Sequence, residues 1–263
     1  MAGMRYDLIN LKDRTNTLAC HWLSRRNATL PRGRYVSLAF DDFPRSAYTE
    51  ARPLIESRGW RATWYVCGGL EGRQDPMYGA MFKRSDLLDL HARGHDIGCH
   101  TYDHVDCAAA PAREVEHELA RNDAYLSSLG LPQCSSFAFP FGAANLAAKR
   151  NILRTGLALR GVKPGLHTGT ADLGMLKAVA LQANMGGTDA AHDALDILSG
   201  SEGWLILFTH DVRAGHSPYG TTPEAYAELL AHVERTGAEV LSVDAMLSRL
   251  ASSGTQENFK IAA

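Results

Sequence analysis

Acidic and imidazole side chains follow three apolar runs of this chain, at the point where each run ends. Asp41 and Asp42 come directly after YVSLAF, and His210 follows WLILFT. The run DIGC leads into HTYDH, which holds His100 and His104 four residues apart. Two imidazoles and one carboxylate can bind a divalent metal with positions left for water and substrate, and the remaining Asp and His form an acid and base pair. Such a set can hydrolyse a bond that a metal polarises.

Each of these placements also has an ordinary structural explanation. An Asp at a strand end commonly caps a turn or the next helix, and a single His after a strand is commonly a satisfied polar residue. The spacing of the paired histidines is weak evidence by itself, because His91 and His95 have the same separation at an expected helix end and exposed loop. The metal interpretation therefore depends on the three strand ends lying together.

The elements that must position these side chains alternate between strands and helices. Short β-branched or aromatic runs predict strands at 35–40, 62–67, 96–99, 136–139, 157–162, 204–209 and 239–243. Helical patterns lie at 85–93, 111–129 and 223–236. This alternation predicts an α/β fold, a single distorted (β/α) barrel with about seven parallel strands, with an open doubly wound sheet as the alternative. A parallel barrel gathers the carboxyl ends of its strands on one rim, which would unite the three sets.

Composition fits one globular domain. Hydrophobic residues make up 45% of the 263 positions, enough for a sizeable core. We expect a single domain over 1–263, with its core at about 32–250, a peripheral N-terminal segment and a C-terminal tail. The 27 basic and 29 acidic side chains give a net charge of −2, so no global basic field attracts nucleic acid or an anionic membrane, although a local basic patch stays open.

Cysteine usage and apolar runs exclude further classes. Five Cys without a C-x-x-C pair argue against a disulfide framework and against a Cys-based zinc site. The first thirty residues carry charges every few positions, and no run of 18 apolar residues occurs in the sequence. We therefore expect no signal peptide, no membrane span and a cytoplasmic protein.

Four segments of the chain, in order, resemble the motifs of the polysaccharide deacetylase family, also called carbohydrate esterase family four or NodB-homology enzymes. AFDDF at 39–43 is similar to T-F-D-D-G, and HTYDH at 100–104 resembles H-[ST]-x-x-x-H in loose form. FAFPFG at 137–142 resembles R-x-P-[YF]-G, and LILFTH at 205–210 resembles L-x-H. The resemblance extends over about 36–243, and the four motifs together are specific although each is weak alone.

The resemblance implies a role for each matching position. Asp41 would be the general base, and His210 would be the general acid for the departing amine. The backbone N–H of Phe141 would help to hold the tetrahedral oxyanion. A divalent metal, most commonly zinc in this family, would be held by Asp42, His100 and His104.

Three positions depart from the family pattern. The Gly after the Asp pair is Phe43, so we expect this loop to run differently. The Arg of the third motif, which steadies the base in the family, is Ala138, so the pKa of Asp41 loses one lowering influence. The Asp-containing motif that orients the acid His has no clean match; Asp172 is our candidate, with a helix N-cap as its alternative role.

The loop after His210 is long for a connection between a strand and a helix, and it carries His216 and Tyr219. Long rim loops often shape a substrate pocket, although turn chemistry around Pro218 and Gly220 explains the composition equally well. Both side chains are therefore candidates for support of the site or for substrate contact.

The prediction is a metal-dependent hydrolase that removes the N-acetyl group from an N-acetylated sugar of a polysaccharide or a surface-glycan precursor. A cytoplasmic location favours a nucleotide-linked, lipid-linked or growing precursor of surface polysaccharide biosynthesis. Two other interpretations stay open. A non-haem iron enzyme uses the same two-His-one-Asp triad but has no need of Asp41 or His210. A catalytically silent carbohydrate-binding relative fits the departures at Phe43 and Ala138, but not the retention of all five polar site residues.

Overall fold

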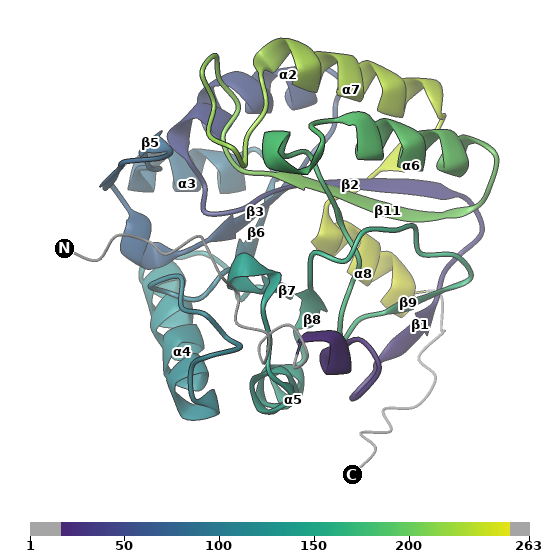
Figure 1. Cartoon of the computed structure of the whole chain (residues 1–263). Helices are drawn as coiled ribbons and strands as arrows, with labels where there is room; N and C mark the ends of the chain where they lie inside the picture. Colours follow the sequence, from purple (N-terminus) through teal and green to yellow (C-terminus); the bar gives the residue numbers. More distant parts are fainter. Residues whose placement is uncertain (1–16, 253–263) are drawn as a thin grey trace.

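A curled sheet of parallel strands forms the centre of the molecule, with helices packed outside it (Figure 1). The computed structural model describes residues 17–252, so the predicted C-terminal tail lies almost entirely outside the described residues. Seven strands follow the order β10, β11, β2, β3, β6, β7 and β8, and every pairing between them is parallel. The predicted distorted (β/α) barrel with about seven parallel strands is confirmed.

Six of the seven predicted strands belong to this path, with bounds within two residues of those expected. They are β2 (Arg34–Phe40), β3 (Thr63–Val66), β6 (Asp96–Cys99), β7 (Ser136–Ala138), β8 (Ala158–Arg160) and β11 (Gly203–Thr209). The seventh, β12 (Glu239–Val240), pairs with the first half of β2, beside the path. The path instead includes β10 (Val179–Ala180), whose two residues are too few to show a strand pattern in the sequence.

The sheet curls until its two ends meet. Arg160, at the end of β8, forms an isolated parallel bridge with Leu176, three residues before β10. The Leu176 N–H donates to the carbonyl of Leu159 at 2.7 Å, and the Gly161 N–H donates to the carbonyl of Leu176 at 2.9 Å. These hydrogen bonds connect the last strand of the path to the segment that leads into the first. Two antiparallel pairs lie outside the path: β1 (Asn27–Thr29) with β9 (Thr170–Asp172), and β4 (Gln74–Asp75) with β5 (Gly79–Ala80).

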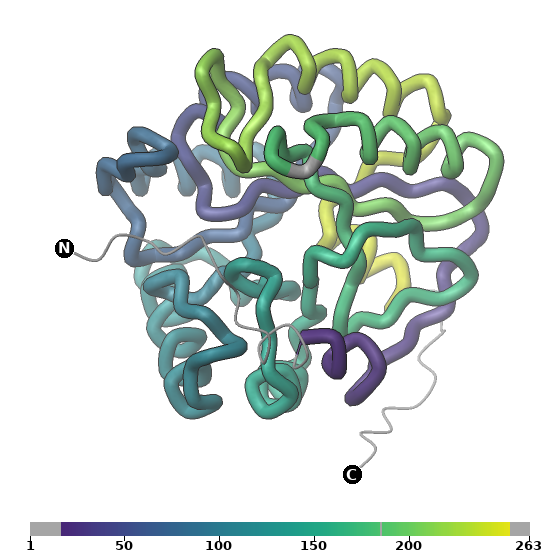
Figure 2. Tube along the Cα trace, in the orientation of Figure 1, coloured from purple at the N-terminus to yellow at the C-terminus, as the bar shows by residue number. Residues whose placement is uncertain are grey.

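Most helices follow the strands and cover the outside of the sheet, whereas the last helix lies on the other face of β2 (Figures 1 and 2). The three predicted helices are present as α3 (Arg84–Ala92), α4 (Ala112–Ser128) and α7 (Pro223–Arg235). The others are α2 (Arg52–Glu56), α5 (Leu146–Arg154), α6 (Asp189–Ser199) and α8 (Val243–Ser252), with short turns η1 (Ala47–Ala51), η2 (Gly68–Leu70), η3 (Pro140–Gly142) and η4 (Ala183–Met185). Within residues 17–252, no helix combines the length and apolar character needed to cross a bilayer.

Strand β2 is buried on both faces, as a strand of a covered parallel sheet must be. Val36, Leu38 and Phe40 pack in the apolar cluster that includes side chains of α6 and α7. Tyr35 and Ala39 point to the opposite face, into a second cluster that includes side chains of α8. This double burial fixes the register of β2, and so fixes where the carboxylates that follow Phe40 emerge.

His95 lies in the core and not in the exposed loop that its position after Gly94 suggested. Its side chain is fully buried, and its Nδ1 accepts hydrogen bonds from the Ala62 N–H at 3.1 Å and the Trp64 indole N–H at 3.2 Å. Its Nε2 lies 3.3 Å from a Glu56 carboxylate oxygen. These contacts require the neutral imidazole with its proton on Nε2, and burial lowers the pKa of His95 to about 4.

We expect His95→Gln to make the fold less sensitive to acid. The native pKa of about 4 lies below the ordinary 6.5, so the unfolded chain binds the extra proton and stability falls as the pH drops through this window. The whole shift corresponds to about 3 kcal/mol. Urea unfolding at pH 7 and at pH 4.5 should show a smaller loss in the variant, whose amide keeps an acceptor and a donor in place. Asp96, whose pKa burial raises to about 6, acts in the opposite direction in both proteins and cancels in the comparison. An equal loss in both proteins would contradict this assignment.

Candidate metal and catalytic site

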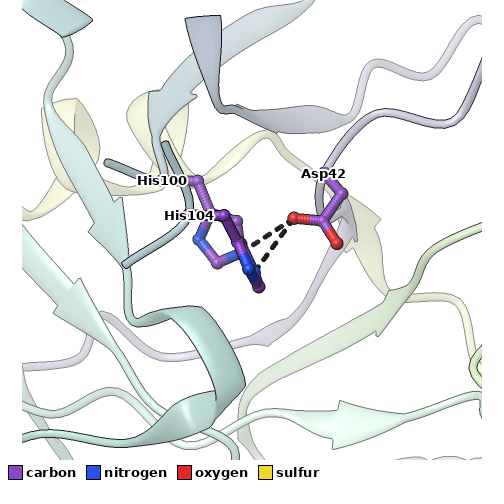
Figure 3. Close-up of side chains that lie close together, drawn as sticks. All are labelled: Asp42, His100 and His104. Carbon is purple, nitrogen blue, oxygen red and sulfur yellow. Dashed lines mark ion pairs between the residues drawn. The ribbon is translucent and has the colours of Figure 1, made fainter. Parts of the chain in front are cut away.

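The carboxyl ends of the strands open on one rim and bring the predicted side chains together. Asp42 follows β2, while His100 and His104 follow β6 and point toward the Asp42 carboxylate (Figure 3). Asp42 Oδ1 lies 3.5 Å from His100 Nε2 and 3.1 Å from His104 Nε2. His210 follows β11, and its Nε2 lies 3.9 Å from Asp42 Oδ2. Three segments that lie 58 or more positions apart in the sequence therefore form one cluster. From the sequence alone, this clustering was an expectation that depended on the three strand ends lying together.

Residues with positive φ bend both loops that carry this cluster. Asp42 and Phe43 each have φ of +60°, and the Phe43 N–H donates to the Asp41 carbonyl at 2.6 Å, which closes a three-residue turn. After β6, Thr101 and His104 have φ of +63° and +54°. Left-handed backbone costs a residue other than Gly roughly 1–2 kcal/mol, and such strain is concentrated at functional sites.

The expectation that Phe43 diverts its loop is wrong, because Phe43 adopts the left-handed conformation that Gly would take. Its ring is fully buried, stacks on Phe82 with centroids 4.9 Å apart, and lies 4.8 Å from the ring of Trp64. Burial of a Phe side chain contributes about 2–3 kcal/mol, which offsets the strain of the backbone. The Asp pair therefore keeps its place without a Gly.

Burial sets the protonation of the cluster. It lowers the pKa of His100 to about 4 and the pKa of His104 to about 3, so both imidazoles are neutral and keep a lone pair. His100 Nδ1 lies 2.8 Å from the carbonyl oxygen of Ala138, to which it donates, and this leaves the lone pair of Nε2 available to a metal. Burial also raises the pKa of Asp42, against the opposing influence of His100 and His210.

The donor set fits a divalent transition metal. One carboxylate oxygen and two imidazole nitrogens, all on buried residues, lie within 4.8 Å of one another. Asp42 Oδ2 and His104 Nδ1 have no hydrogen-bond partner among the described residues. A buried carboxylate oxygen without a hydrogen bond is costly, and a bound cation removes that cost. Two nitrogens and one oxygen with further positions open suit zinc and other first-row metals.

We expect His104→Ala to lose the metal and to keep the fold. Loss of one of three protein ligands should lower the metal content of dialysed protein from about one ion per chain to below about 0.1. Elemental analysis of purified protein gives this ratio, and circular dichroism checks the fold. His91→Ala, which removes an exposed imidazole on α3, is the matched control and should stay fully loaded. A fully loaded His104→Ala protein would exclude this residue as a ligand.

The cation beside Asp41 comes from a strand that the motifs do not indicate. Arg160, the last residue of β8, is fully buried, and its Nη2 lies 2.5 and 2.6 Å from the two Asp41 carboxylate oxygens. Burial alone would raise the pKa of Asp41, but Arg160, then His100 and His210, hold it below its ordinary value. Ala138 and Arg160 are register partners on β7 and β8. Arg160 therefore supplies, from the neighbouring strand, the positive charge that Ala138 lacks. An Arg ending the apolar run LALR was the signal available in the sequence.

Aromatic rings and an amide surround His210. Its ring stacks on Tyr78, with centroids 5.6 Å apart and planes at 10°, and lies 5.7 Å from the ring of Tyr219. Gln182, two residues after β10, places an amide nitrogen 3.5 Å from His210 Nδ1. Neither Tyr78 nor Gln182 carried a signal in the sequence, because Tyr78 lies in the turn between β4 and β5 and Gln182 lies between β10 and η4, and no motif marks either segment.

The prediction that Asp172 orients His210 is wrong. The Asp172 carboxylate accepts hydrogen bonds from the backbone N–H groups of Arg26 at 2.8 Å and Gly174 at 2.9 Å, and it pairs with Arg25 at 3.4 Å. Asp172 ends β9 in a turn, so it is not a helix N-cap either. Its partners are set by the pairing of β9 with β1, which no local pattern revealed.

The loop after His210 is tied down by Asp211, which is fully buried and accepts hydrogen bonds from the Ser217 hydroxyl at 2.6 Å and N–H at 2.8 Å. Of the two predicted rim residues, Tyr219 lies beside His210. His216 instead places Nδ1 2.7 Å from the carbonyl oxygen of Ser217, within its own loop.

Phe141 lies beside the metal-binding cluster. Its φ is +59°, and its ring meets the ring of His104 edge-on with centroids 4.5 Å apart. The side chain of Phe141 therefore contacts one of the three clustered residues, and the oxyanion role of its N–H stays a prediction. Trp64 and Tyr65 are both fully buried, so neither ring is exposed for sugar stacking.

A curled (β/α) barrel with a buried Asp-His-His cluster and a neighbouring Asp–Arg pair on its carboxyl rim defines the class of metal-site barrels equipped for hydrolysis. The family model described as polysaccharide deacetylase matches residues 29–159, which contain the Asp pair, both metal-site histidines and η3. The chain belongs to the polysaccharide deacetylase family.

Two curated relatives are similar to parts of this chain. A chitin deacetylase of Pestalotiopsis sp is 25% identical over 41% of this chain and 37% of its own length. A relative from Bacillus subtilis (strain 168) is 23% identical over 60% of this chain and 55% of its own length. The chain thus spans between about a third and about half of the length of these relatives.

Solved structures share the fold at low sequence identity. The Xyl-CE4 domain of a multidomain xylanase from the hindgut metagenome of Trinervitermes trinervoides superposes with a TM-score of 0.61 at 15% identity, covering 87% of this chain and 96% of that one. A family 4 carbohydrate esterase from Streptomyces lividans gives a TM-score of 0.56 at 20% identity, covering 81% and 93%. These likenesses support the barrel architecture.

Proposed function

We propose that this protein is a metal-dependent hydrolase that removes the N-acetyl group from an N-acetylated sugar of a polysaccharide or surface-glycan precursor. The observation that carries the proposal is the Asp41–Arg160 pair standing next to the Asp42, His100 and His104 cluster on one rim. Family membership supports this reaction, and relatives named as chitin and peptidoglycan N-acetylglucosamine deacetylases support an N-acetylated glycan as substrate. The iron-enzyme alternative has no use for the Asp41–Arg160 pair.

The residues divide the chemistry between them. Asp42, His100 and His104 would hold the ion, for which we propose zinc. A bound divalent metal supplies Lewis acidity to the amide carbonyl and lowers the pKa of water. Asp41, kept ionised by Arg160, accepts a proton from the water whose oxygen bonds to the amide carbon.

The leaving nitrogen takes its proton from His210, so the C–N bond breaks to give acetate and a free amine. The backbone N–H of Phe141 donates a hydrogen bond to the oxyanion. Tyr78 and Gln182 keep the His210 ring oriented toward the cluster, and Tyr219 offers a ring beside it for substrate contact.

Acetate release tests the proposal. Purified, metal-loaded protein is incubated with N-acetylhexosamine oligosaccharides, peptidoglycan-type glycans and N-acetylated sugar nucleotides, with and without chelator. We expect acetate and free amine in equal amounts from one class, and loss of both on chelation. Failure of fully metallated protein on every class would favour a silent carbohydrate-binding relative. The cytoplasmic location stays a prediction, which cell fractionation with an antibody to the protein checks.

A further inference from the structure

Three of the most exposed large apolar side chains in the described part of the chain lie on one short segment. Leu18, Trp22 and Leu23 are 59%, 70% and 47% exposed. The N–H groups of Trp22 and Leu23 donate to the Ala19 carbonyl at 3.1 and 3.0 Å, so the segment is helical and Leu18 and Trp22 share a face. We call residues 17–23 the apolar turn. Single exposed apolar residues are ordinary, but a contiguous group marks an interaction surface.

The apolar turn is firmly attached to the barrel. Cys20 is fully buried, and Lys149 on α5 donates hydrogen bonds from Nζ to the carbonyls of Cys20 and Leu23 at 2.5 and 2.7 Å. The Thr17 hydroxyl accepts from the Ala144 N–H at 3.1 Å. Figure 1 shows the turn, in purple, beside α5 and β8. The inner face is thus fixed, and the apolar side chains project outward from a rigid backbone.

The place of attachment is the side of the barrel that carries the candidate site. Ala144 stands three residues after Phe141, in the loop that leaves η3. Gly161 directly follows Arg160, the last residue of β8, and it lies beside His21 of the turn. The apolar turn therefore borders the strand ends from which the site opens.

Positive charge surrounds the apolar turn. Lys163 Nζ lies 5.4 Å from the centre of the Trp22 ring. Burial, followed by Lys163 and Lys149, lowers the pKa of His21, and Lys177 acts in the same direction. Lys149 is buried under the turn, so Lys163 and Lys177 are the ammonium groups that remain for a partner. This local excess contrasts with the net charge of −2 for the whole chain.

Acidic charge beside the turn is already compensated. The Arg25 side chain is 45% exposed and pairs with Asp172, which is itself mostly buried. The Asp172 carboxylate also accepts the N–H groups of Arg26 and Gly174. The surface presented to a partner is therefore apolar at Trp22 and basic around it.

We propose that the apolar turn docks the protein onto an anionic phospholipid surface, with Leu18, Trp22 and Leu23 among the headgroups and the surrounding basic side chains on lipid phosphates. Trp is favoured at the membrane interface, and basic side chains are attracted to anionic headgroups. Two Leu side chains contribute nothing to sugar stacking, which favours a bilayer over a carbohydrate platform. Docking holds the catalytic rim near the surface, as a lipid-linked glycan would require; that choice of substrate rests on the proposed function, whereas docking itself does not.

Sedimentation with vesicles tests the proposal on the full chain. We expect binding to vesicles of phosphatidylcholine containing about one third phosphatidylglycerol, weaker binding to phosphatidylcholine alone, and release at high salt. Trp22→Ser and Leu18→Ser should each lower the bound fraction at least about fivefold. Ile197→Ser, which removes an equally exposed apolar side chain from α6, should bind as wild type does. Lys163→Glu should weaken binding, whereas Arg113→Glu on α4 should not.

Three results would overturn the proposal. The first is no binding of wild-type protein to anionic vesicles at low salt, and the second is equal binding by Trp22→Ser. The third is an effect of Trp22→Ser on another partner: slower turnover of soluble oligosaccharides would assign a sugar platform, and loss of a dimer in light scattering would assign a second copy of this chain. Asp41→Asn should bind vesicles fully, so failure of the catalytic proposal is distinguishable from failure of docking.

Discussion

Asp41→Asn is expected to lower kcat for deacetylation roughly a thousandfold while the protein keeps its metal. Asn has the shape of Asp but cannot accept a proton from the attacking water. The metal cluster uses Asp42, His100 and His104, so the ion should stay bound at the wild-type ratio. Acetate release measured together with elemental analysis separates these two effects. Unchanged turnover would remove Asp41 as the general base.

Asp41→Asn also removes the carboxylate that pairs with Arg160, so its effect on stability needs a control. The guanidinium of Arg160 is buried and contacts both Asp41 oxygens, so Asp41→Asn leaves this charge without its carboxylate partner. An unpaired buried charge destabilises a fold by about 3–5 kcal/mol. Asp41→Asn/Arg160→Gln removes the orphaned charge and should recover much of the lost stability without recovering activity. Recovery of activity in the double variant would show that the single variant was inactive through misfolding.

Arg160→Ala is expected to lower kcat about a hundredfold, with a smaller change in KM, and to destabilise the protein by about 3–5 kcal/mol. Arg160 holds the base ionised and in place but is a positioning residue, since it contacts the carboxylate and not the substrate. Ala138 and Arg160 are register partners on adjacent parallel strands, so their side chains project to the same face about 4.8 Å apart. An Arg at position 138 can therefore approach Asp41 from the neighbouring strand.

The double variant Arg160→Ala/Ala138→Arg tests positioning against a purely structural role. We expect it to regain at least about tenfold in kcat over Arg160→Ala, because a cation again faces the base. Arg160→Ala/Ser136→Arg is the matched control, since Ser136 lies two residues earlier on β7 and pairs with Ala158, away from the strand end. Equal activity of the two double variants would show that the position of the cation does not matter.

The strands and their polar ends could be read from the sequence because each depends on a local pattern. YVSLAF, DIGC and WLILFT are apolar enough to be buried wherever they pack, and a parallel sheet puts all their carboxyl ends on one side. The direction of the parallel strands is therefore enough to predict that Asp42, His100 and His104 lie near one another. The four motifs then added roles to the same positions.

Contacts set by register and closure could not be read in this way. Arg160 reaches Asp41 across the barrel interior, and Gln182 reaches His210 from the segment that follows the two-residue strand β10. Asp172 was a suitable residue type to orient His210, but the pairing of β9 with β1 directs its carboxylate to other partners. Each depends on which strand lies beside which, and no single segment of sequence records that.

The sequence by itself predicted the parallel strands and the rim on which Asp42, His100 and His104 meet, because burial of apolar runs and the direction of a parallel sheet are local or general constraints. Only the tertiary structure decided how the site is completed. The ring of Phe43 gains enough from its buried packing to offset a left-handed backbone, and the Asp41 carboxylate pairs with Arg160 of β8, whose register partner on β7 is Ala138. These outcomes depend on free energies of packing and charge pairing between distant segments, which exist only once the sheet has closed.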